Sequence, residues 1–173
     1  MNKTAILVAG LVLSTTALAD NIIKFQGEVA EQTCDVSVNG STSSPLVLLP
    51  TVPTTALDTA GSTAGQTSFT ISVSGCTPGA SETAIKTVFV GNNLTGTNRM
   101  GNTGTASNVS LQLVDPASAA VPLDLTGQIG APGLKLAAAA TTASHDFAVQ
   151  YYAESAVTAG SVLGSVQYAI SYQ

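Results

Sequence analysis

Hydrophobic and polar residues alternate with a period of two over several short segments of this chain. The clearest segment is the last one, in which Val166, Tyr168, Ile170 and Tyr172 alternate with small or polar residues. Successive side chains of a β-strand point to opposite faces, so this period predicts a strand that is buried on one side. Chain ends are usually frayed; here we expect an ordered strand that runs to the last residues.

The same alternation recurs along most of the chain. A row near its start comprises Ile23, Phe25, Gly27 and Val29. Loops rich in Gly, Ser, Thr, Pro and Asn separate the segments. Only Leu134–Ala143 has a weak helical signal; it leaves room for a short helical turn, but no packed helix is expected. Many short strands with few helices predict an all-β antiparallel sandwich of two packed sheets. The predicted strands are Cys34–Val38, Leu46–Leu49, Thr67–Ser74, Ile85–Val90, Val109–Val114, Asp146–Tyr152 and Val162–Tyr172.

Residues 1–19 have the pattern of a secretory signal peptide. Lys3 precedes an apolar stretch, and Ala17-Leu-Ala19 is typical of a cleavage site, with cleavage after Ala17 as a variant. The apolar stretch is too short to span a bilayer, so no membrane insertion is expected. Residues 20–173 are then about the size of one domain.

Two cysteines, Cys34 and Cys76, remain in the exported chain. An even number of cysteines in an oxidising compartment predicts a disulfide. A reactive thiol would need a C-x-x-C spacing or a nearby histidine, and the sequence has neither.

The charge balance excludes two classes of partner. After removal of residues 1–19 there are four basic and ten acidic residues, a formal net charge of −6. Without a basic patch, neither nucleic acid nor an anionic membrane surface is an expected partner. Only 9% of the residues are charged. That suits a protein largely covered by copies of itself, but also an ordinary periplasmic domain.

The sequence contains no arrangement typical of an enzyme or of a metal site. His145 is the only histidine, and beside Asp146 at a predicted strand start it is expected on the surface. No serine lies in a Gly-x-Ser-x-Gly turn, and zinc or copper would need several His or Cys ligands. A periplasmic sandwich enzyme of the superoxide-dismutase type is incompatible with a single histidine. We therefore expect neither an enzyme nor a cofactor.

Taken together, these features resemble the structural pilins of chaperone–usher fimbriae. The stretch Phe25-Gln-Gly-Glu-Val29 followed by Thr33–Val38 is similar to the family's N-terminal extension and first strand, and Phe69–Cys76 to its second strand. The family's C-terminal Gly and Tyr correspond to Gly160 and Tyr172. Within the family, the chain looks most like type 1 and type 3 major subunits. One departure is that only five residues, Asp20–Lys24, precede Phe25.

The resemblance implies an immunoglobulin-like sandwich that lacks its seventh strand and is completed by a donor strand from another chain. Residues 20–32 would be the donor extension, with Ile23, Phe25, Gly27 and Val29 facing inward, and residues 33–173 the pilin domain. The groove edge would be formed by the C-terminal segment, namely Gly160, Val166, Tyr168, Ile170 and Tyr172.

The implied partners are other copies of this chain and other pilins, a periplasmic pilus chaperone and an outer-membrane usher. The implied function is that of a structural subunit of an adhesive fimbria, exported through the periplasm to the surface of a Gram-negative bacterium. A minor pilin, adaptor or terminator of the same system is the alternative. Another alternative for residues 22–30 is an ordinary first strand of a closed sandwich.

Overall fold

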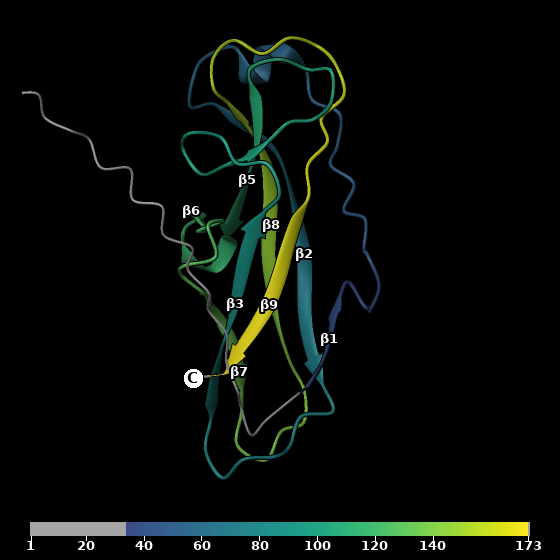
Figure 1. Cartoon of the computed structure of the whole chain (residues 1–173), viewed down its shortest axis with the longest axis vertical. Helices are drawn as coiled ribbons and strands as arrows, with labels where there is room; N and C mark the ends of the chain where they lie inside the picture. Colours follow the sequence, from purple (N-terminus) through teal and green to yellow (C-terminus); the bar gives the residue numbers. More distant parts are fainter. Residues whose placement is uncertain (1–33, 173) are drawn as a thin grey trace, which may run out of the picture.

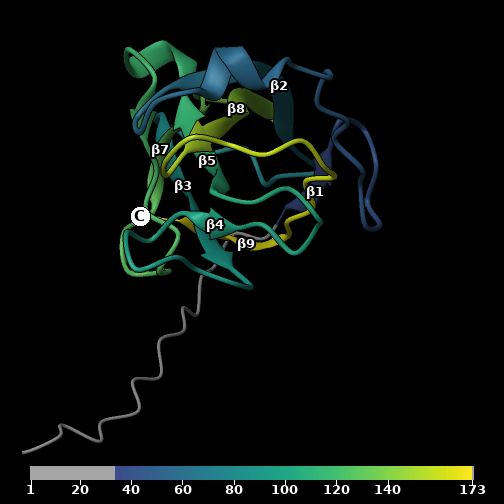
Figure 2. The same ribbon diagram turned by 90° about the horizontal axis from the view of Figure 1, so that it is seen from above.

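The computed structural model describes residues 34–172 as an antiparallel β-sandwich. One sheet has the strand order β1-β2-β8-β5-β4, with β6 also paired to β5; the other has the order β7-β3-β9 (Figures 1 and 2). The strands are β1 Asp35–Val38, β2 Thr63–Ser74, β3 Thr83–Gly91, β4 Met100–Gly101, β5 Val109–Asp115, β6 Val121–Pro122, β7 Ala131–Leu136, β8 Ala143–Ala153 and β9 Val166–Tyr172, and the short 3-10 helices are η1 Thr54–Leu57 and η2 Pro116–Ser118.

Three phenylalanines mark the centre of the core between the sheets. The rings of Phe89 and Phe147 meet edge to face with centroids 5.2 Å apart, and Phe69 packs against both. Edge-to-face packing is a favoured arrangement of aromatic rings, and large buried rings dominate the energy of a core. The core faces of β2, β3 and β8 are therefore the ones that the alternation of their sequences predicts.

The disulfide between Cys34 and Cys76 is present, with a Cα–Cα distance of 4.5 Å. It joins the residue before β1 to the loop after β2, where Asp35 lies opposite Ser74 in the antiparallel ladder. Closing a loop of this length is worth about 4 kcal/mol in the chain-entropy model. The predicted disulfide is confirmed, and it fastens the short strand β1 to the long strand β2.

Most of the predicted strands occur, but two segments differ. Residues 46–49 form no strand, although Val47 and Leu49 pack against the core. In Leu134–Ala143, the segment with a weak helical signal, Leu134 lies within β7, a strand that was not predicted, and a turn over residues 137–140 follows. The alternation Ala131-Pro-Gly-Leu-Lys-Leu136 buries residues 131, 134 and 136, a pattern that a proline and a glycine obscured in the sequence.

Gly65 allows β2 to start four residues earlier than predicted. The pairing of β2 with β8 shifts between Ala64 and Thr67, as in a β-bulge, and Gly65 has a φ of +66°. A Cβ atom on Gly65 would lie 2.9 Å from the ring of Tyr151. Glycine adopts this backbone conformation without strain, so the bulge lets the Tyr151 ring pack closely. Its burial raises the pKa of the Tyr151 hydroxyl.

The outer face of β5 and β8 is covered, although the alternation predicted that solvent would reach it. Ser110, Gln112 and Gln150 are 0%, 6% and 7% exposed. The Gln150 amide donates to Gln112 Oε1 at 2.9 Å, and the Arg99 guanidinium lies 3.5 Å from the centre of the Tyr152 ring. Buried polar groups are costly unless they are hydrogen-bonded; the bond from Gln150 satisfies the side-chain oxygen of Gln112, whereas Arg99 Nε has no partner among residues 34–172.

The sequence suggested that His145 lies on the surface, but most of its side chain is covered. Its ring packs against Phe147 with centroids 4.7 Å apart, and its Nε2 atom lies 3.2 Å from Asp115 Oδ1. The Asp115 carboxylate also accepts hydrogen bonds from Ala117 N and Ser118 Oγ. Because β8 begins at Ala143, His145 lies inside the strand and not at its start, and it helps to hold the turn after β5.

Asp124 organises the loop between β6 and β7. Its carboxylate accepts hydrogen bonds from the backbone N–H groups of Thr126, Gln128 and Ile129, and from the Thr126 hydroxyl. Partial burial raises the pKa of Asp124, but these hydrogen bonds favour the ionised form, and the pKa is lowered overall.

A first prediction concerns the pH dependence that Asp124 gives to stability. A carboxyl group whose pKa is lower in the folded chain stabilises the fold above its unfolded pKa of about 3.9. That contribution is lost as the pH falls through the lower folded value. In urea titrations, Asp124→Asn should be less stable than the wild type at pH 6, with a difference that shrinks below pH 4. A difference that does not depend on pH would contradict this role of the carboxylate.

A second prediction concerns Thr87, whose hydroxyl is fully buried and has no hydrogen-bond partner among residues 34–172. An unsatisfied buried polar group costs about 1–3 kcal/mol. Thr87→Val keeps the side-chain shape and removes the hydroxyl, so it should raise the free energy of unfolding by about 1 kcal/mol. Thr126→Val, which removes a hydroxyl bonded to Asp124, should lower it. A loss of stability in Thr87→Val would show that the hydroxyl is satisfied.

Candidate functional site

Strand β9 is the edge strand of the smaller sheet, and its core-facing side chains are incompletely buried. It pairs with β3 from Gly91↔Val166 to Ile85↔Tyr172. Ile85 and Phe89 on β3 are each 1% exposed, whereas the residues opposite them are only half-buried. The half-buried residues that pack against the core are Val166, Tyr168, Ile170 and Tyr172. The core is therefore less well covered at β9 than one strand further in.

A second incompletely covered segment is formed by residues 44–52, which follow β1. Their side chains alternate, with Val47 and Leu49 packed against the core and Leu46 and Leu48 78% and 76% exposed. Within the described part of the chain, residues 44–52 make no hydrogen bond. Such a segment has the side-chain pattern of a strand without the ladder that defines one, which is why no strand forms at residues 46–49.

The two segments belong to edges of different sheets at one corner of the sandwich. β1 ends the larger sheet and β9 ends the smaller one; in Figure 1, β9 crosses in front of β8 and β2, and β1 lies to the right of them. Figure 2 shows β1 at the right of the molecule and β9 along its lower side. At the lower end in Figure 1 the edges are tied together, because the Cys34 backbone N–H donates to the Tyr172 hydroxyl at 3.0 Å. Tyr172 therefore contributes a hydrogen bond in addition to apolar area.

Gly160 lies outside β9, so the predicted strand Val162–Tyr172 begins late, at Val166. A Cβ atom on Gly160 would clash with the backbone of Thr105 and Ala106. Just beyond it, Ser161 accepts a hydrogen bond from Ala106 N at 3.0 Å, and Leu163 O accepts one from Thr103 N at 2.9 Å. Gly160 thus permits a close backbone contact that anchors the chain before it enters β9.

The edge at β9 has the features that strand addition requires. An edge strand with a half-buried apolar row can accept another strand, whose main chain extends the ladder and whose alternate side chains complete the core. Between Val166 and Tyr172 the sequence carries no charged side chain, so no buried charge opposes such a contact.

Other kinds of site are poorly represented in the described chain. No three His, Cys, Asp or Glu side chains are grouped as metal ligands within residues 34–172. No helix in this range has the length and apolar character to cross a bilayer. His145 contacts the Asp115 carboxylate and lies close to Gly133, so these contacts give it a structural role.

Of the site residues predicted from the sequence, the structure brings Val166, Tyr168, Ile170 and Tyr172 into one row along β9. Ile23, Phe25, Gly27 and Val29 lie outside the described residues. That residues 44–52 pair with no strand was not predicted, although Pro45 and Pro50 on either side of Leu46–Leu49 are residues that interrupt sheet pairing.

Comparison with known proteins is consistent with this geometry. The family model described as "Fimbrial protein" matches residues 23–173. The chain is 33% identical to the F17 fimbrial protein of Escherichia coli, covering 92% of this chain and 91% of that protein. It is also 33% identical to the major fimbrial subunit SMF-1 of Stenotrophomonas maltophilia (strain K279a), covering 89% and 93%.

Among solved structures, the P pilus rod subunit PapA is similar, with a TM-score of 0.59 at 16% identity, over 80% of this chain and 99% of that one. That likeness confirms the immunoglobulin-like sandwich fold. The family match and the two relatives extend over nearly the whole chain. The chain therefore belongs to the fimbrial protein family and is a structural subunit of a surface fimbria of a Gram-negative bacterium.

Proposed function

We propose that this subunit polymerises by donor-strand exchange, with the corner between β9 and residues 44–52 as the acceptor. The observation that carries the proposal is the half-burial of Val166, Tyr168 and Ile170 opposite the fully buried side of β3. The donor is residues 20–32 of another copy, with Ile23, Phe25, Gly27 and Val29 facing inward. Residues 1–19 are a signal peptide, and residues 33–173 form the pilin domain.

The energetics support this assignment. An added strand between the two edges would cover the inner side chains of both: Tyr168 and Ile170 on β9, and Val47 and Leu49 on the opposite segment. Each apolar side chain of the donor that goes from exposed to fully buried contributes about 1.5–3 kcal/mol. The half-buried side chains of the acceptor contribute less each, and the ladder of main-chain hydrogen bonds adds to this. A donor of about nine residues would therefore bind far more tightly than a surface contact between two subunits.

An open acceptor is a hazard before assembly, because an uncovered edge invites aggregation. In this proposal a periplasmic chaperone lends a strand to the same corner, and the outer-membrane usher is where the donor of the next subunit replaces it. The name of the S. maltophilia relative, a major fimbrial subunit, supports a place in the shaft of the filament. In purified fimbriae, this chain would then be the most abundant protein.

The first test of donor-strand exchange uses Gly27→Leu. A leucine at this inward position would overpack the acceptor, so the variant should remain folded and bound to its chaperone but form no filaments. Gln26→Leu, at the adjacent outward position, is the matched control and should assemble. Deletion of residues 20–28 should block donation as well. Filaments of the deletion variant with wild-type resistance to heat and detergent would exclude strand exchange.

A second test concerns the chaperone and uses Tyr172→Ser. The change removes apolar area from β9 and the partner of the Cys34 N–H group, so less subunit should accumulate in the periplasm and less chaperone should co-purify with it. Ala169→Ser, on the exposed side of the same strand, should behave as the wild type. Equal recovery of the complex from both variants would show that the chaperone docks elsewhere.

A further inference from the structure

A small cavity lies beside β5, on the opposite side of that strand from β8. β4 pairs with β5 at Ser110 and Leu111, and β6 pairs with it at Val114 and Asp115. Gln112 and Leu113 lie between these two ladders and line a cavity of about 90 Å³ together with Arg99. The cavity thus occupies an interruption in the sheet, separate from the corner between β9 and residues 44–52.

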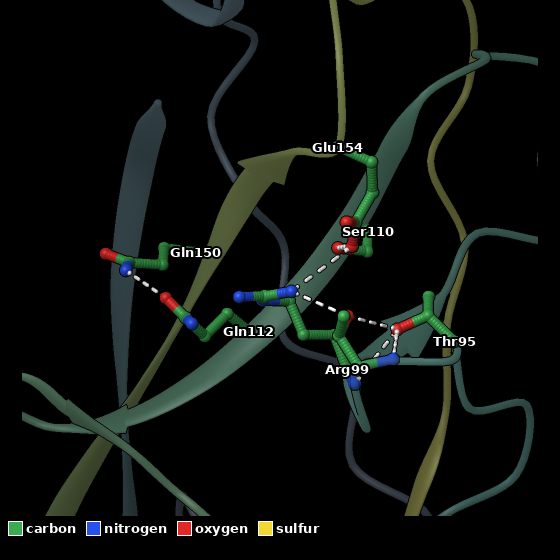
Figure 3. Close-up of polar contacts among 7 residues, drawn as sticks. Thr95, Arg99, Ser110, Gln112, Gln150 and Glu154 are labelled. Atoms are coloured by element: carbon green, nitrogen blue, oxygen red, sulfur yellow. Dashed lines mark hydrogen bonds and ion pairs between the residues drawn. The ribbon is translucent and has the colours of Figure 1, made fainter. Parts of the chain in front are cut away.

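Two of the residues that line this cavity, Arg99 and Gln112, carry a hydrogen-bond donor for which the described chain supplies no acceptor. Arg99 Nε is buried and has no hydrogen-bond partner among residues 34–172. The Gln112 side-chain oxygen is used by Gln150 at 2.9 Å, which leaves the Gln112 amide nitrogen as a donor. In Figure 3 this nitrogen lies on the side of Gln112 that faces the Arg99 guanidinium. Buried donors in folded proteins are nearly always satisfied, so an acceptor oxygen is expected here.

The surroundings of Arg99 favour an uncharged acceptor. Its Nη1 atom donates to Thr97 Oγ1 at 2.7 Å and lies 3.6 Å from the Glu154 carboxylate (Figure 3). The guanidinium also lies over the Tyr152 ring. Its charge is thereby largely compensated, and an added carboxylate would be repelled by Glu154. A carbonyl oxygen accepts two donors without that repulsion.

The rest of the cavity suits a small apolar substituent. Its lining includes four apolar residues, Leu113, Pro122, Leu123 and Leu125, of which Leu113 and Leu125 are 2% and 1% exposed. A cavity of about 150 Å³ accommodates benzene. An acetamido group has fewer non-hydrogen atoms than benzene, so it can enter the smaller space with its methyl group on the leucines. We infer that the cavity is a binding site for a neutral acetamido group, held by Arg99 Nε and the Gln112 amide.

The test uses the fact that Arg99 is the only arginine of the chain. Full chain labelled with [15N]arginine therefore gives a single Nε–Hε resonance that reports on the cavity. N-methylacetamide should shift this resonance with saturation, while acetate at equal concentration should not. Saturation by N-acetylgalactosamine as well would identify N-acetylated sugars as ligands, and its failure would restrict the site to peptide-type amides. The absence of a saturating shift with either amide, or an equal response to acetate, would overturn the inference.

Two variants make the result specific. Gln112→Glu places an acceptor opposite Arg99, so it should shift the resonance without ligand and weaken amide binding about tenfold or more, as expected for loss of a buried hydrogen-bond site. Gln66→Glu, an equal charge change at an exposed position of β2, should bind as the wild type. If Gln112→Glu does not fold, Arg99→Lys removes the Nε donor, and the Gln112 amide resonances then replace the arginine as the probe. Undiminished binding in the folded variant would overturn the assignment.

Discussion

Burial of apolar side chains between two sheets stabilises this subunit, and the two sheets do not cover their core equally. In the interior, β3 presents Ile85 and Phe89 to β2 and β8, and almost no surface of these residues is left accessible. At the corner between β9 and residues 44–52, side chains of the same kind are half-accessible and the main chain of residues 44–52 makes no hydrogen bonds within the described chain. The centre of the core is thus fully covered, whereas at the edge apolar side chains remain accessible to water and peptide groups remain unpaired, so that edge contributes less to the free energy of folding.

One disulfide and one hydrogen bond hold the chain together at one end of this corner. A four-residue strand such as β1 is held weakly by its ladder alone. The Cys34–Cys76 disulfide fixes its start to the end of β2, and the Tyr172 hydroxyl binds the Cys34 N–H group. The disulfide thus fixes β1 within its own sheet, and the hydrogen bond to Tyr172 joins the edge of that sheet to the edge of the other.

The periodic pattern of the sequence predicted the sandwich well, because strands such as β2, β5 and β9 show the alternation without interruption. It failed where local patterns compete with long-range contacts. β7 contains a proline and a glycine, and residues 46–49 alternate as a strand would but have no neighbour to pair with. Periodicity also did not predict the burial of Gln112 and Gln150 or the partial burial of His145, since residues distant in sequence cover them. The row on β9 was predictable because it depends on one continuous segment.

Pro45 and Pro50 give the exposed segment after β1 a limited capacity for pairing. Neither residue has an N–H group, so only Leu46–Leu49 between them can donate to a neighbouring strand. A long, regular edge of the same composition could template the stacking of identical chains, as in amyloid. The prolines shorten that edge without removing its inward leucine and valine. Before assembly, this chain can therefore expose an apolar edge that another strand can bind, while the prolines limit the stacking of further identical strands on that edge.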